Sequence, residues 1–559
     1  MLILEIKNLK KYFGEKLILD IDDLRIDSTD KIGIVGVNGS GKSTLLNIIS
    51  GKESYDEGLI NLYTDYSYIE QFCNDNLTEK TMDRKLAGKL GVHNLISENK
   101  SGGEITKEKI AEAFSTSSGL LIADEPTSNL DIGSIEVLEK SLKNLPGAVI
   151  LVSHDRNILN NICTKIIEIE FSKIKVFNGN YNDYVSQKKA NFERSKFEYK
   201  EYIKEKKRLE MAAIGSTEKS KAMRSAPKRM GNSEARLHKR GVTGKKEKLE
   251  KKAKAIESRI EHLEKKENPK ENKSIQLSVV DSNKIYSKIA LEGKDLNKSF
   301  GSRILFKDSY FKIPTGSKTA IIGNNGAGKT TLINMILKGN ENIKVSSSAK
   351  ISYFSQNLNI LNEEKTILQN VMDSTDYNES FVRIVLSQLL FFKDDVFKKV
   401  SVLSGGEKVK VSLAKVLLTP SNILILDEPT NYLDITSQRA LEELLKGYDG
   451  TLLMVSHDKE FIRNIANRLV IIKNEELITF NGSYDSYLAK SLATNAKYDL
   501  RQKEDSVNIK EKLMVLENEL SLVIGKLSFA INEEEKIVLD IRYLELLSEI
   551  KSLKKETPL

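Results

Sequence analysis

The sequence is poor in the residues that build metal centres, and it has no long apolar run. Its 559 residues include two cysteines, Cys73 and Cys163. Two cysteines cannot supply a zinc or iron–sulfur ligand set, and we expect both to be reduced, part-buried apolar residues. No segment approaches the roughly 18 apolar residues that a membrane-spanning helix requires. The start, MLILEIKNLKKYFGEK, lacks the order of basic, apolar and small residues of a signal peptide. These absences predict a cytoplasmic protein without a pore or permease of its own.

The positive charge is concentrated in one segment of the chain. The whole chain carries 87 Lys and Arg against 79 Asp and Glu, a net charge of +8. Residues 188–267 hold 26 basic and 13 acidic side chains, so the remainder is net acidic. Such asymmetry points to a polyanionic partner for this segment.

The chain repeats four motifs in the same order. The pairs are GVNGSGKST (36–44) with GNNGAGKTT (323–331), SGGE (101–104) with SGGE (404–407), IADEPTSNLD (122–131) with ILDEPTNYLD (425–434), and LVSHD (151–155) with MVSHD (454–458). The last three pairs are offset by 303 residues, whereas the lysines of the first pair are offset by 287. This spacing indicates two copies of one fold, with the second copy 16 residues longer between its first two motifs.

The first motif of each copy fits the phosphate-binding loop G-x-x-x-x-G-K-[ST]. An apolar strand ends in a glycine-rich turn that opens a helix, and the glycines free backbone N–H groups to hold phosphates. Lys42 would reach the β- and γ-phosphates and Ser43 would hold Mg²⁺, with Lys329 and Thr330 in these roles in the second copy. The residues expected to contact ATP are Gly36, Asn38, Gly39, Gly41, Lys42, Ser43, Thr44, Gly323, Asn325, Gly326, Gly328, Lys329, Thr330 and Thr331.

The third motif predicts a buried strand that ends in two adjacent carboxylates. Asp124 and Asp427 would lie near Mg²⁺. Glu125 and Glu428 would polarise an attacking water, either as a general base or by positioning it. An acid pair at a strand end is unremarkable alone, but it is informative downstream of a phosphate-binding loop.

The fourth motif places a histidine after a further strand. His154 and His457 each lie 29 residues beyond the glutamate of their copy. A lone histidine is more often structural than catalytic. The matched spacing in both copies favours a contact with the γ-phosphate.

In this order and twice, the motifs resemble those of the ATP-binding cassette ATPases, over roughly residues 1–187 and 286–490. The resemblance implies an α/β fold with two P-loop cassettes in a head-to-tail sandwich, where each ATP lies between one P-loop and the other copy's SGGE. It implies ATP and Mg²⁺ as cofactors and hydrolysis of ATP to ADP and phosphate. It also implies a monomer whose two cassettes pair within one chain.

The resemblance assigns further roles by position. Gln71 and Gln356 match the glutamine loop that contacts Mg²⁺. Phe13 and Phe300 match the aromatic that stacks on adenine, although the adjacent Tyr12 is an alternative. Segments 128–131 and 431–434 match the loop that links the two sites. The signature residues expected to face the opposite ATP are Ser101, Gly102, Gly103, Glu104, Ser404, Gly405, Gly406 and Glu407.

The first signature departs from the pattern of the family. It reads KSGGEI, with Lys100 in place of the usual leucine, whereas the second reads LSGGEK. Only 30 positions separate Gln71 from Ser101, so we expect a reduced helical subdomain in the first copy. In the sandwich this signature completes the site built on Lys329, and we therefore expect the two ATP sites to differ.

Residues 188–285 join the two cassettes. KKANFERSKFEYKEYIKEKKRLE and KKEKLEKKAKAIESRIEHLEKKE have helix-forming composition with sparse apolar residues, which predicts two long antiparallel helices. Between them lie the helix breakers Gly215, Pro227, Gly231, Gly241 and Gly244, which predict an irregular basic tip near 211–244. A solvated spacer is the plain alternative. The excess of Lys and Arg favours phosphate binding, and RNA over DNA, because a projecting hairpin can probe folded RNA by its shape.

Paired cassettes without a membrane domain and with a charged helical linker further resemble the ABC-F proteins, which act on ribosomes. APKRMGNSEARLHKR looks most like the linker of the Vga/Vml/Lsa-type antibiotic-resistance members. The resemblance implies a 70S ribosome as the partner, with the linker in the tRNA exit site. There it would shift P-site tRNA and 23S rRNA and dislodge antibiotics from the peptidyl transferase centre. The candidates for RNA contact are Lys228, Arg229, Arg236, Lys239 and Arg240.

Two other functions stay open at this point. A housekeeping ABC-F translation factor would act on stalled ribosomes without regard to drugs. An ATPase subunit of an efflux transporter with a separate permease would give the basic linker no role. Zinc-bearing DNA-repair ATPases and iron–sulfur ribosome-recycling ATPases need cysteines that this chain lacks.

The tail, residues 491–559, carries two apolar stripes with alternating spacings of three and four residues. They consist of Leu513, Leu516, Leu520, Val523 and Leu527, and of Leu539, Tyr543, Leu546, Ile550 and Leu553. This spacing predicts a short coiled-coil hairpin that turns near SFAINEEE. Simple self-packing and added ribosome contacts are both open as its role.

Overall fold

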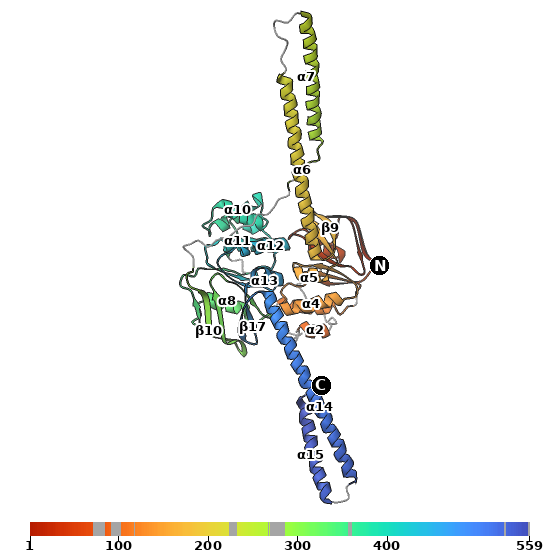
Figure 1. Cartoon of the computed structure of the whole chain (residues 1–559), viewed down its shortest axis with the longest axis vertical. Helices are drawn as coiled ribbons and strands as arrows, with labels where there is room; N and C mark the ends of the chain where they lie inside the picture. The colour runs from red at the N-terminus through yellow and green to blue at the C-terminus, as the bar shows by residue number, and fades with distance from the viewer. Residues whose placement is uncertain are drawn as a thin grey trace. The chain divides into compact units, whose positions relative to one another are not determined.

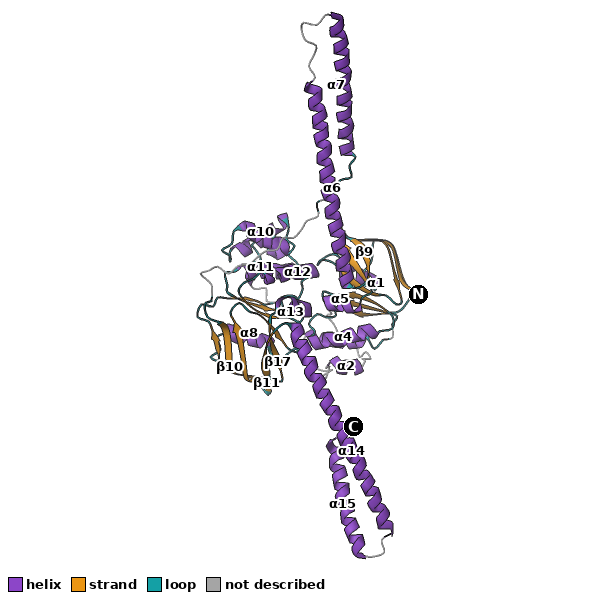
Figure 2. Ribbon diagram, viewed as in Figure 1, coloured by secondary structure: helices purple, strands orange, loops and turns teal. Residues whose placement is uncertain are grey.

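The computed structural model describes most of the chain (Figures 1 and 2). The described residues are 1–70, 84–90, 102–116, 118–222, 232–266, 268, 285–355, 360–529 and 533–556. They form two compact units. The first unit, Met1–Ile465 with Val470–Ile478, holds both repeat copies and the segment between them. The second unit, Ala466–Leu469 with Thr479–Leu559, holds the C-terminal helices.

The first copy is built on a nine-stranded sheet in the order β4-β1-β2-β9-β8-β3-β7-β6-β5. Its strands are β1 (Leu2–Phe13), β2 (Lys16–Asp27), β3 (Lys31–Val35), β4 (Glu57–Leu62), β5 (Tyr66–Ile69), β6 (Leu120–Asp124), β7 (Ala148–Val152), β8 (Lys165–Glu170) and β9 (Lys173–Asn178). β3, β5, β6, β7 and β8 are parallel, whereas β1 pairs antiparallel with β2 and β4. Every residue of β6 and β7 is buried, as expected of parallel strands covered on both faces. The buried strand predicted before Glu125 is therefore confirmed.

The helices of the first copy follow these strands. They are α1 (Lys42–Ile49), α2 (Arg84–Leu90), α3 (Gly102–Ala113), α4 (Ile132–Asn144) and α5 (Arg156–Ile162). α1 begins after the loop that leaves β3, and α5 begins after the loop that leaves β7. Because parallel strands end at the same edge of a sheet, the loops after β3, β6 and β7 are brought together there.

The second copy repeats this arrangement with two sheets, of order β14-β15-β16-β12-β17-β18 and β11-β10-β13. The strands are β10 (Ile289–Phe300), β11 (Arg303–Pro314), β12 (Lys318–Ile322), β13 (Ile343–Val345), β14 (Ile351–Phe354), β15 (Ile423–Asp427), β16 (Thr451–Val455), β17 (Arg468–Lys473) and β18 (Glu476–Asn481). The helices are α8 (Lys329–Leu337), α9 (Ile367–Met372), α10 (Glu379–Gln388), α11 (Gly405–Leu418), α12 (Ile435–Lys446) and α13 (Lys459–Ile465), with short 3-10 helices η3 (Lys393–Phe397) and η4 (Val400–Val402). α9, α10, η3 and η4 all lie between β14 and α11. The corresponding segment of the first copy lies mostly outside the described residues, so its reduced subdomain stays a prediction.

The segment between the copies forms two antiparallel helices, α6 (Tyr181–Ala222) and α7 (Asn232–Glu261), which lie side by side in Figure 1. Glu198 lies 3.6 Å from Lys266, and Glu205 lies 3.8 Å from Arg259. Nearer the turn, the Ser220 hydroxyl lies 3.1 Å from a Glu250 carboxylate oxygen. The predicted antiparallel hairpin is confirmed.

The prediction of an irregular tip near 211–244 is wrong over most of that range. α6 continues to Ala222 and α7 begins at Asn232, so Gly215, Gly241 and Gly244 lie inside helices. A helical glycine costs about 1 kcal/mol relative to alanine, which is too little to end a helix packed along a partner. The boundaries predicted at 187/188 and 490/491 also fall inside helices, because α6 begins at Tyr181 and α14 begins at Tyr484.

The second unit contains the predicted C-terminal hairpin, α14 (Tyr484–Phe529) and α15 (Glu533–Glu556). Arg542 lies 3.3 Å from Glu519, and Lys554 lies 2.9 Å from Glu517, so the two helices pair antiparallel. All ten residues of the two predicted stripes are at least half-buried, and their neighbours are almost all exposed. The heptad-like spacing therefore identified the packed faces correctly.

Candidate functional site

The two glycine-rich loops have the same geometry. Gly41 and Gly328, the residues before α1 and α8, have φ values of 98° and 102°, which favour glycine because an L side chain would be strained there. Lys42 Nζ donates to the carbonyl of Gly36 at 2.9 Å, and Lys329 Nζ donates to the carbonyl of Gly323 at 2.9 Å. Each ammonium is thus held against its own loop, at the N-terminus of a helix where backbone N–H groups are free to bind anions.

Burial and nearby carboxylates have opposite effects on the pKa of these two lysines. Burial lowers the pKa of Lys42 and Lys329, while Glu125 and Glu428 respectively act to raise it. Lys42 is buried. A partly desolvated cation beside a helix N-terminus is suited to holding the charge of a phosphate chain.

The strand-end glutamates are held in an uncommon backbone conformation. Glu125 and Glu428 have φ values of 50° and 48°, a left-handed region that costs a residue other than glycine on the order of 1–3 kcal/mol. Their backbone N–H groups donate to the carbonyls of Val152 and Val455 at 2.9 and 3.0 Å. Both copies keep this strain at the same position, which is typical of a functional site.

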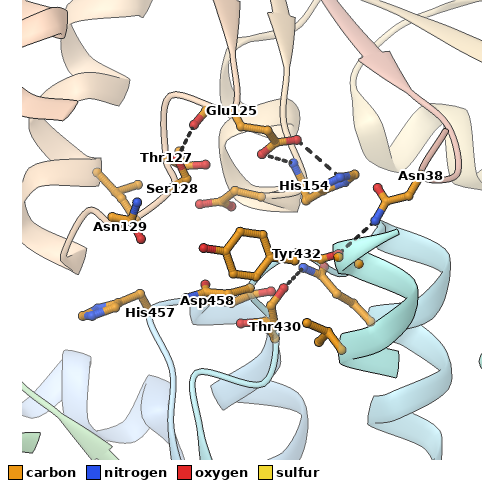
Figure 3. A pocket seen from close by; sticks show the side chains of 17 residues that line it. Asn38, Glu125, Thr127, Ser128, Asn129, His154, Thr430, Tyr432, His457 and Asp458 are labelled. Carbon is orange, nitrogen blue, oxygen red and sulfur yellow. Dashed lines mark hydrogen bonds and ion pairs between the residues drawn. The ribbon is translucent and has the colours of Figure 1, made fainter. Parts of the chain in front are cut away.

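Each glutamate is paired with the histidine of the same copy, and Figure 3 shows the pair of the first copy. His154 Nε2 lies 3.4 Å from Glu125 Oε1, and the His154 backbone N–H donates to Glu125 Oε2 at 3.2 Å. In the second copy these distances, from His457 to Glu428, are 3.3 and 3.3 Å. The spacing of 29 residues, seen in the sequence, thus brings the two groups into contact.

Burial controls the protonation of these pairs. It raises the pKa of Glu125 to about 8 and that of Glu428 to about 7. It lowers the pKa of His154 and His457 to about 3. Both imidazoles are therefore neutral at pH 7, so each has one N–H to donate and one nitrogen to accept.

The strand-end aspartates fit a Mg²⁺ site. Asp124 Oδ1 is buried and has no hydrogen-bond partner among the described residues. Burial raises the pKa of Asp124 and Asp427. Thr330 Oγ1 donates to Asp427 Oδ2 at 3.1 Å, and Ser43 makes the matching contact with Asp124. Magnesium in such sites takes one or two protein oxygens and substrate phosphates, and the described residues hold no larger His, Cys, Asp and Glu cluster.

The aromatic residues predicted to stack on adenine are exposed at the end of the first strand of each copy. Phe13 and Phe300 are 50% and 57% exposed, so each ring has a free face. The ammonium of Lys11 lies 5.2 Å from the Phe13 ring centroid, and that of Lys298 lies 5.1 Å from the Phe300 ring centroid. Phe300 lines a cavity of about 520 Å³ together with Lys329 and other residues of its loop. This position is consistent with a base-stacking role, which stays a prediction for both rings.

The two copies meet head to tail. Asn38 in the first loop donates from Nδ2 to the carbonyl of Tyr432 at 2.8 Å, and Asn325 in the second loop donates to the carbonyl of Asn129 at 2.9 Å. The signature glycines face the same asparagines: a Cβ on Gly103 would lie 2.9 Å from Asn325 Nδ2. A Cβ on Gly406 would likewise lie 2.9 Å from Asn38 Nδ2. The predicted sandwich is therefore present, and each loop faces the signature of the other copy.

A cavity of about 520 Å³ lies between the copies at this interface (Figure 3). It is lined by Asn38, Glu125, Thr127, Ser128, Asn129, Ile135, His154, Asp155, Gly405, Gly406, Val409, Thr430, Asn431, Tyr432, Gln438, His457 and Asp458. Glu125 and His154 of the first copy thus line the same cavity as Asn38 of the first loop and the signature glycines Gly405 and Gly406. The sequence analysis assigned all of these residues to one ATP site. Ser128 and Asn129 of segment 128–131 line it, as do Asn431 and Tyr432 of segment 431–434, as expected of a loop that links the two sites.

The second signature begins a helix. Ser404 caps α11 and forms a reciprocal pair with Glu407, whose Oε2 accepts from the Ser404 backbone N–H at 2.9 Å. Part of the role of Glu407 is therefore to hold the helix N-terminus in shape. In the first copy Gly102, Gly103 and Glu104 open α3.

Several predicted residues lie outside the described part of the chain. They are Gln71, Cys73, Lys100, Ser101, Lys228, Arg229 and Gln356. Arg236, Lys239 and Arg240 lie on α7, but their side chains are outside what the structure describes. The other cysteine, Cys163, is buried as expected.

The structure also shows ion pairs between and beside the copies that the sequence analysis did not identify. Lys410 and Asp434 form a buried pair at 3.0 Å, and their repeat equivalents Lys107 and Asp131 lie 3.7 Å apart. The 303-residue offset relates Lys107 to Lys410, so the repeat itself contained a signal for this pair. Among the described residues, the ion pairs that cross between the copies include those of Arg156 with Glu442 and Asp458, and that of Lys459 with Glu136.

Known proteins share this sequence and fold. A family model described as ABC transporter matches residues 19–128 and 306–431. The chain is 33% identical to the ribosome protection protein VmlR of Bacillus subtilis, over 94% of each protein. It is 35% identical to the erythromycin resistance ATP-binding protein MsrA of Staphylococcus epidermidis, over 80% of this chain and 93% of that protein. The solved structure of an RNase-L inhibitor superposes with a TM-score of 0.59 at 18% identity, over 87% of this chain and 93% of that one, which shows a shared fold. Within the described ranges, no helix has the length and apolar character needed to span a bilayer.

Proposed function

Because the chain belongs to the ABC-F family of ATP-binding cassette ATPases, we propose that it binds the 70S ribosome while closed on two ATP molecules and leaves after hydrolysis. The observation that carries the proposal is the continuity of the first cassette with the basic hairpin. α6 begins three residues after β9 and runs for 42 residues. A change in the pairing of the cassettes would therefore be transmitted to the hairpin by a single helix.

The chemistry proposed for each site is phosphoryl transfer to water. Lys42 and Lys329 would hold the β- and γ-phosphates. Ser43 and Asp124 in the first copy, and their counterparts in the second, would hold Mg²⁺ with Gln71 and Gln356. Mg²⁺, when bound, would neutralise the charge of the phosphates. In each closed site, the P-loop, strand-end acids and histidine of one copy would face the signature of the other.

Glu125 and Glu428 would position the attacking water. Burial raises the pKa of Glu125 to about 8 and that of Glu428 to about 7, so at pH 7 the first carboxyl is mostly neutral and the second is about half neutral. The neutral His154 and His457 lie next to them, and an imidazole N–H there would donate to a γ-phosphate oxygen. Burial thus tunes acid and imidazole in opposite directions, which is a common arrangement for proton transfer in catalysis.

The ribosomal part of the proposal is supported by charge and by the relatives. The hairpin segment holds twice as many basic as acidic side chains, and such a surface binds phosphates by releasing counterions. VmlR is named as a ribosome protection protein and MsrA as an erythromycin resistance protein. We propose that the hairpin enters the tRNA exit site, shifts P-site tRNA and 23S rRNA, and thereby dislodges antibiotics from the peptidyl transferase centre. A housekeeping factor for stalled ribosomes would use the same surfaces without the drug.

The first test is sedimentation with ribosomes. Glu125→Gln/Glu428→Gln would stay closed on ATP, and we expect it to pellet with 70S ribosomes in ATP but not in ADP. Absence of pelleting with either nucleotide would refute the ribosomal proposal and direct the search to a membrane permease. If it pellets, release of a radiolabelled lincosamide from the ribosome separates drug protection from a housekeeping role.

A second variant tests the hairpin. Five exposed lysines near its turn are replaced by glutamine: Lys219, Lys221, Lys245, Lys246 and Lys248. The matched control replaces five exposed lysines on the cassettes: Lys7, Lys16, Lys173, Lys175 and Lys307. Each lost phosphate contact lowers the log–log salt slope by about 0.7–0.9. We expect the slope of the log of the ribosome-binding constant against the log of the salt concentration to become shallower in the hairpin variant. In the control variant this slope should equal that of the parent within error.

A further inference from the structure

The first turn of the linker helix α6 is fixed to the first cassette by a polar cluster. The Tyr184 hydroxyl donates to Glu168 Oε1 on β8 at 2.7 Å, and Lys188 makes an ion pair with the same carboxylate. The Tyr184 ring packs edge-on against Phe177 of β9, with ring centroids 5.0 Å apart. These contacts join α6 to the cassette from which it emerges.

The same turn also contacts the second cassette. The guanidinium of Arg439, on α12, lies 5.6 Å from the ring centroid of Tyr181. Tyr181 is buried and packs against Tyr184, with centroids 5.6 Å apart. A guanidinium at this distance from an aromatic ring is attracted to it, and more strongly where water is excluded. α6 is therefore in contact with both cassettes at its first turn.

The helix that carries Arg439 also takes part in closing the ATP site. Asp434 caps the N-terminus of α12, and its Oδ2 accepts from the Asn38 backbone N–H of the first loop at 3.5 Å. Three residues beyond Arg439, the carboxylate of Glu442 pairs with Arg156, beside the His154 motif. One twelve-residue helix thus touches the phosphate-binding loop, the histidine loop and the linker.

The repeat shows that this contact is not a general feature of the fold. Tyr484 is the equivalent of Tyr181 at the offset of 303 residues, and position 136 is the equivalent of Arg439. Position 136 holds a glutamate, which pairs with Lys459 at 2.8 Å. The guanidinium is therefore present in the copy that faces the linker and is replaced by an acid in the other.

We propose that the contact between Tyr181 and Arg439 couples closure of the cassettes to placement of the linker. When the cassettes close, Arg439 arrives at the Tyr181 ring and holds the first turn of α6 in one orientation. When they separate, the contact is lost and α6 is held by the first cassette alone. Arg439 is thus a positioning residue, and the inference rests on the proposed function only in assigning ribosome binding to the placed linker.

Pulsed electron paramagnetic resonance with paired spin labels tests this in the full chain. The background is Glu125→Gln/Glu428→Gln with Cys73→Ser, and Cys163 is buried and stays unlabelled. One label pair, at Lys143 and Lys338, measures closure between the cassettes. A second pair, at Lys200 and Lys338, measures the linker against the second cassette. All three labelled positions are exposed.

We expect Arg439→Ala to keep the closed Lys143–Lys338 distance in ATP and to broaden the Lys200–Lys338 distance. The placed fraction of the linker should fall about tenfold, equivalent to about 1.4 kcal/mol. Arg439→Lys and Tyr181→Phe keep the cation and the ring respectively, so both should retain most of the placed fraction. Tyr181→Leu keeps an apolar side chain without the ring, and it should reproduce Arg439→Ala.

Three results would overturn the proposal. They are an unchanged linker distance in both Arg439→Ala and Tyr181→Leu, loss of the closed cassette distance in Arg439→Ala, and an equal effect of Glu136→Gln. The last variant removes an exposed ion pair across the same interface that does not involve α6. Pelleting of the parent protein with 70S ribosomes tests the proposed function separately, because the distances can be measured without ribosomes.

Discussion

Arg156 and Lys459 occupy the same position in the two copies, but their ion pairs lie in different environments. Arg156 pairs with Glu442 across the interface, and the two side chains are 9% and 5% exposed. Lys459 pairs with Glu136, and the two side chains are 18% and 50% exposed. We predict that Arg156→Met will impair ATP-driven closure far more than Lys459→Met.

The magnitude follows from desolvation. Burial works to lower the pKa of Arg156, but the hydrogen bond that it donates to Glu442 and the charge of Asp458 hold that pKa above its ordinary value, so the guanidinium stays charged. Removing one partner of a buried pair costs about 3–5 kcal/mol, because the other charge is left without compensation. An exposed pair contributes about 0–1 kcal/mol. Closure should therefore weaken by about 10²–10³-fold or more in Arg156→Met and by about fivefold or less in Lys459→Met.

The assay is the ATP concentration needed for half-maximal closure, measured with the cassette label pair, together with kcat/KM for ATP. Arg156→Met/Glu442→Gln serves as the internal control, because it removes one of the two buried carboxylates, Glu442 and Asp458, that Arg156→Met leaves without their cation. The double variant should recover much of the loss. Equal defects in Arg156→Met and Lys459→Met, or a double variant worse than both single ones, would refute the reasoning.

Four further outcomes are expected. Glu125→Gln should remove more ATP turnover than Glu428→Gln, because the site of Glu428 is completed by the signature that carries Lys100; equal turnover of the two variants would count against different sites. Burial raises the pKa of Glu125 from 4.5 to about 8 and that of Glu428 from 4.5 to about 7. The stability that these two neutral acids contribute to the fold is therefore complete below about pH 4.5 and is lost as the pH rises through 7–8. In thermal melts, Glu125→Gln/Glu428→Gln should have a higher Tm than the parent at pH 8.5 but not at pH 4.5. Gly406→Ala places a Cβ 2.9 Å from Asn38 Nδ2, so Asn38 must shift and give up its hydrogen bond to the Tyr432 carbonyl. This change should weaken ATP-dependent closure by up to about tenfold and leave the melting temperature unchanged. Leu546→Ala truncates a fully buried side chain in the C-terminal hairpin and should lower the stability of the hairpin by about 2–5 kcal/mol. Limited proteolysis should therefore cleave the hairpin faster, while ATP turnover should not change.

The sequence by itself determined the local parts of this protein. The phosphate-binding loops, strand-end acids and histidines were recognised because each depends on a short run of residues whose backbone needs are specific, such as glycine before α1. The equal offset of three motifs then required two copies of one fold. The stripes of the C-terminal hairpin were also predicted correctly, because a packed helix face leaves a period of three and four residues in the chain.

The tertiary structure decided what lies between the copies and along the linker. The pairs of Arg156 with Glu442 and of Arg439 with Tyr181 join residues more than 250 positions apart, and no local pattern marks either partner. The glycines of the linker were misjudged because their local cost, about 1 kcal/mol each, is outweighed by packing of α6 against α7. The sequence sets the chemistry of each loop, since that chemistry depends on neighbouring residues. The coupling of the two ATP sites to the linker depends on which surfaces the folded copies bury against each other, and burial is a property of the tertiary structure alone.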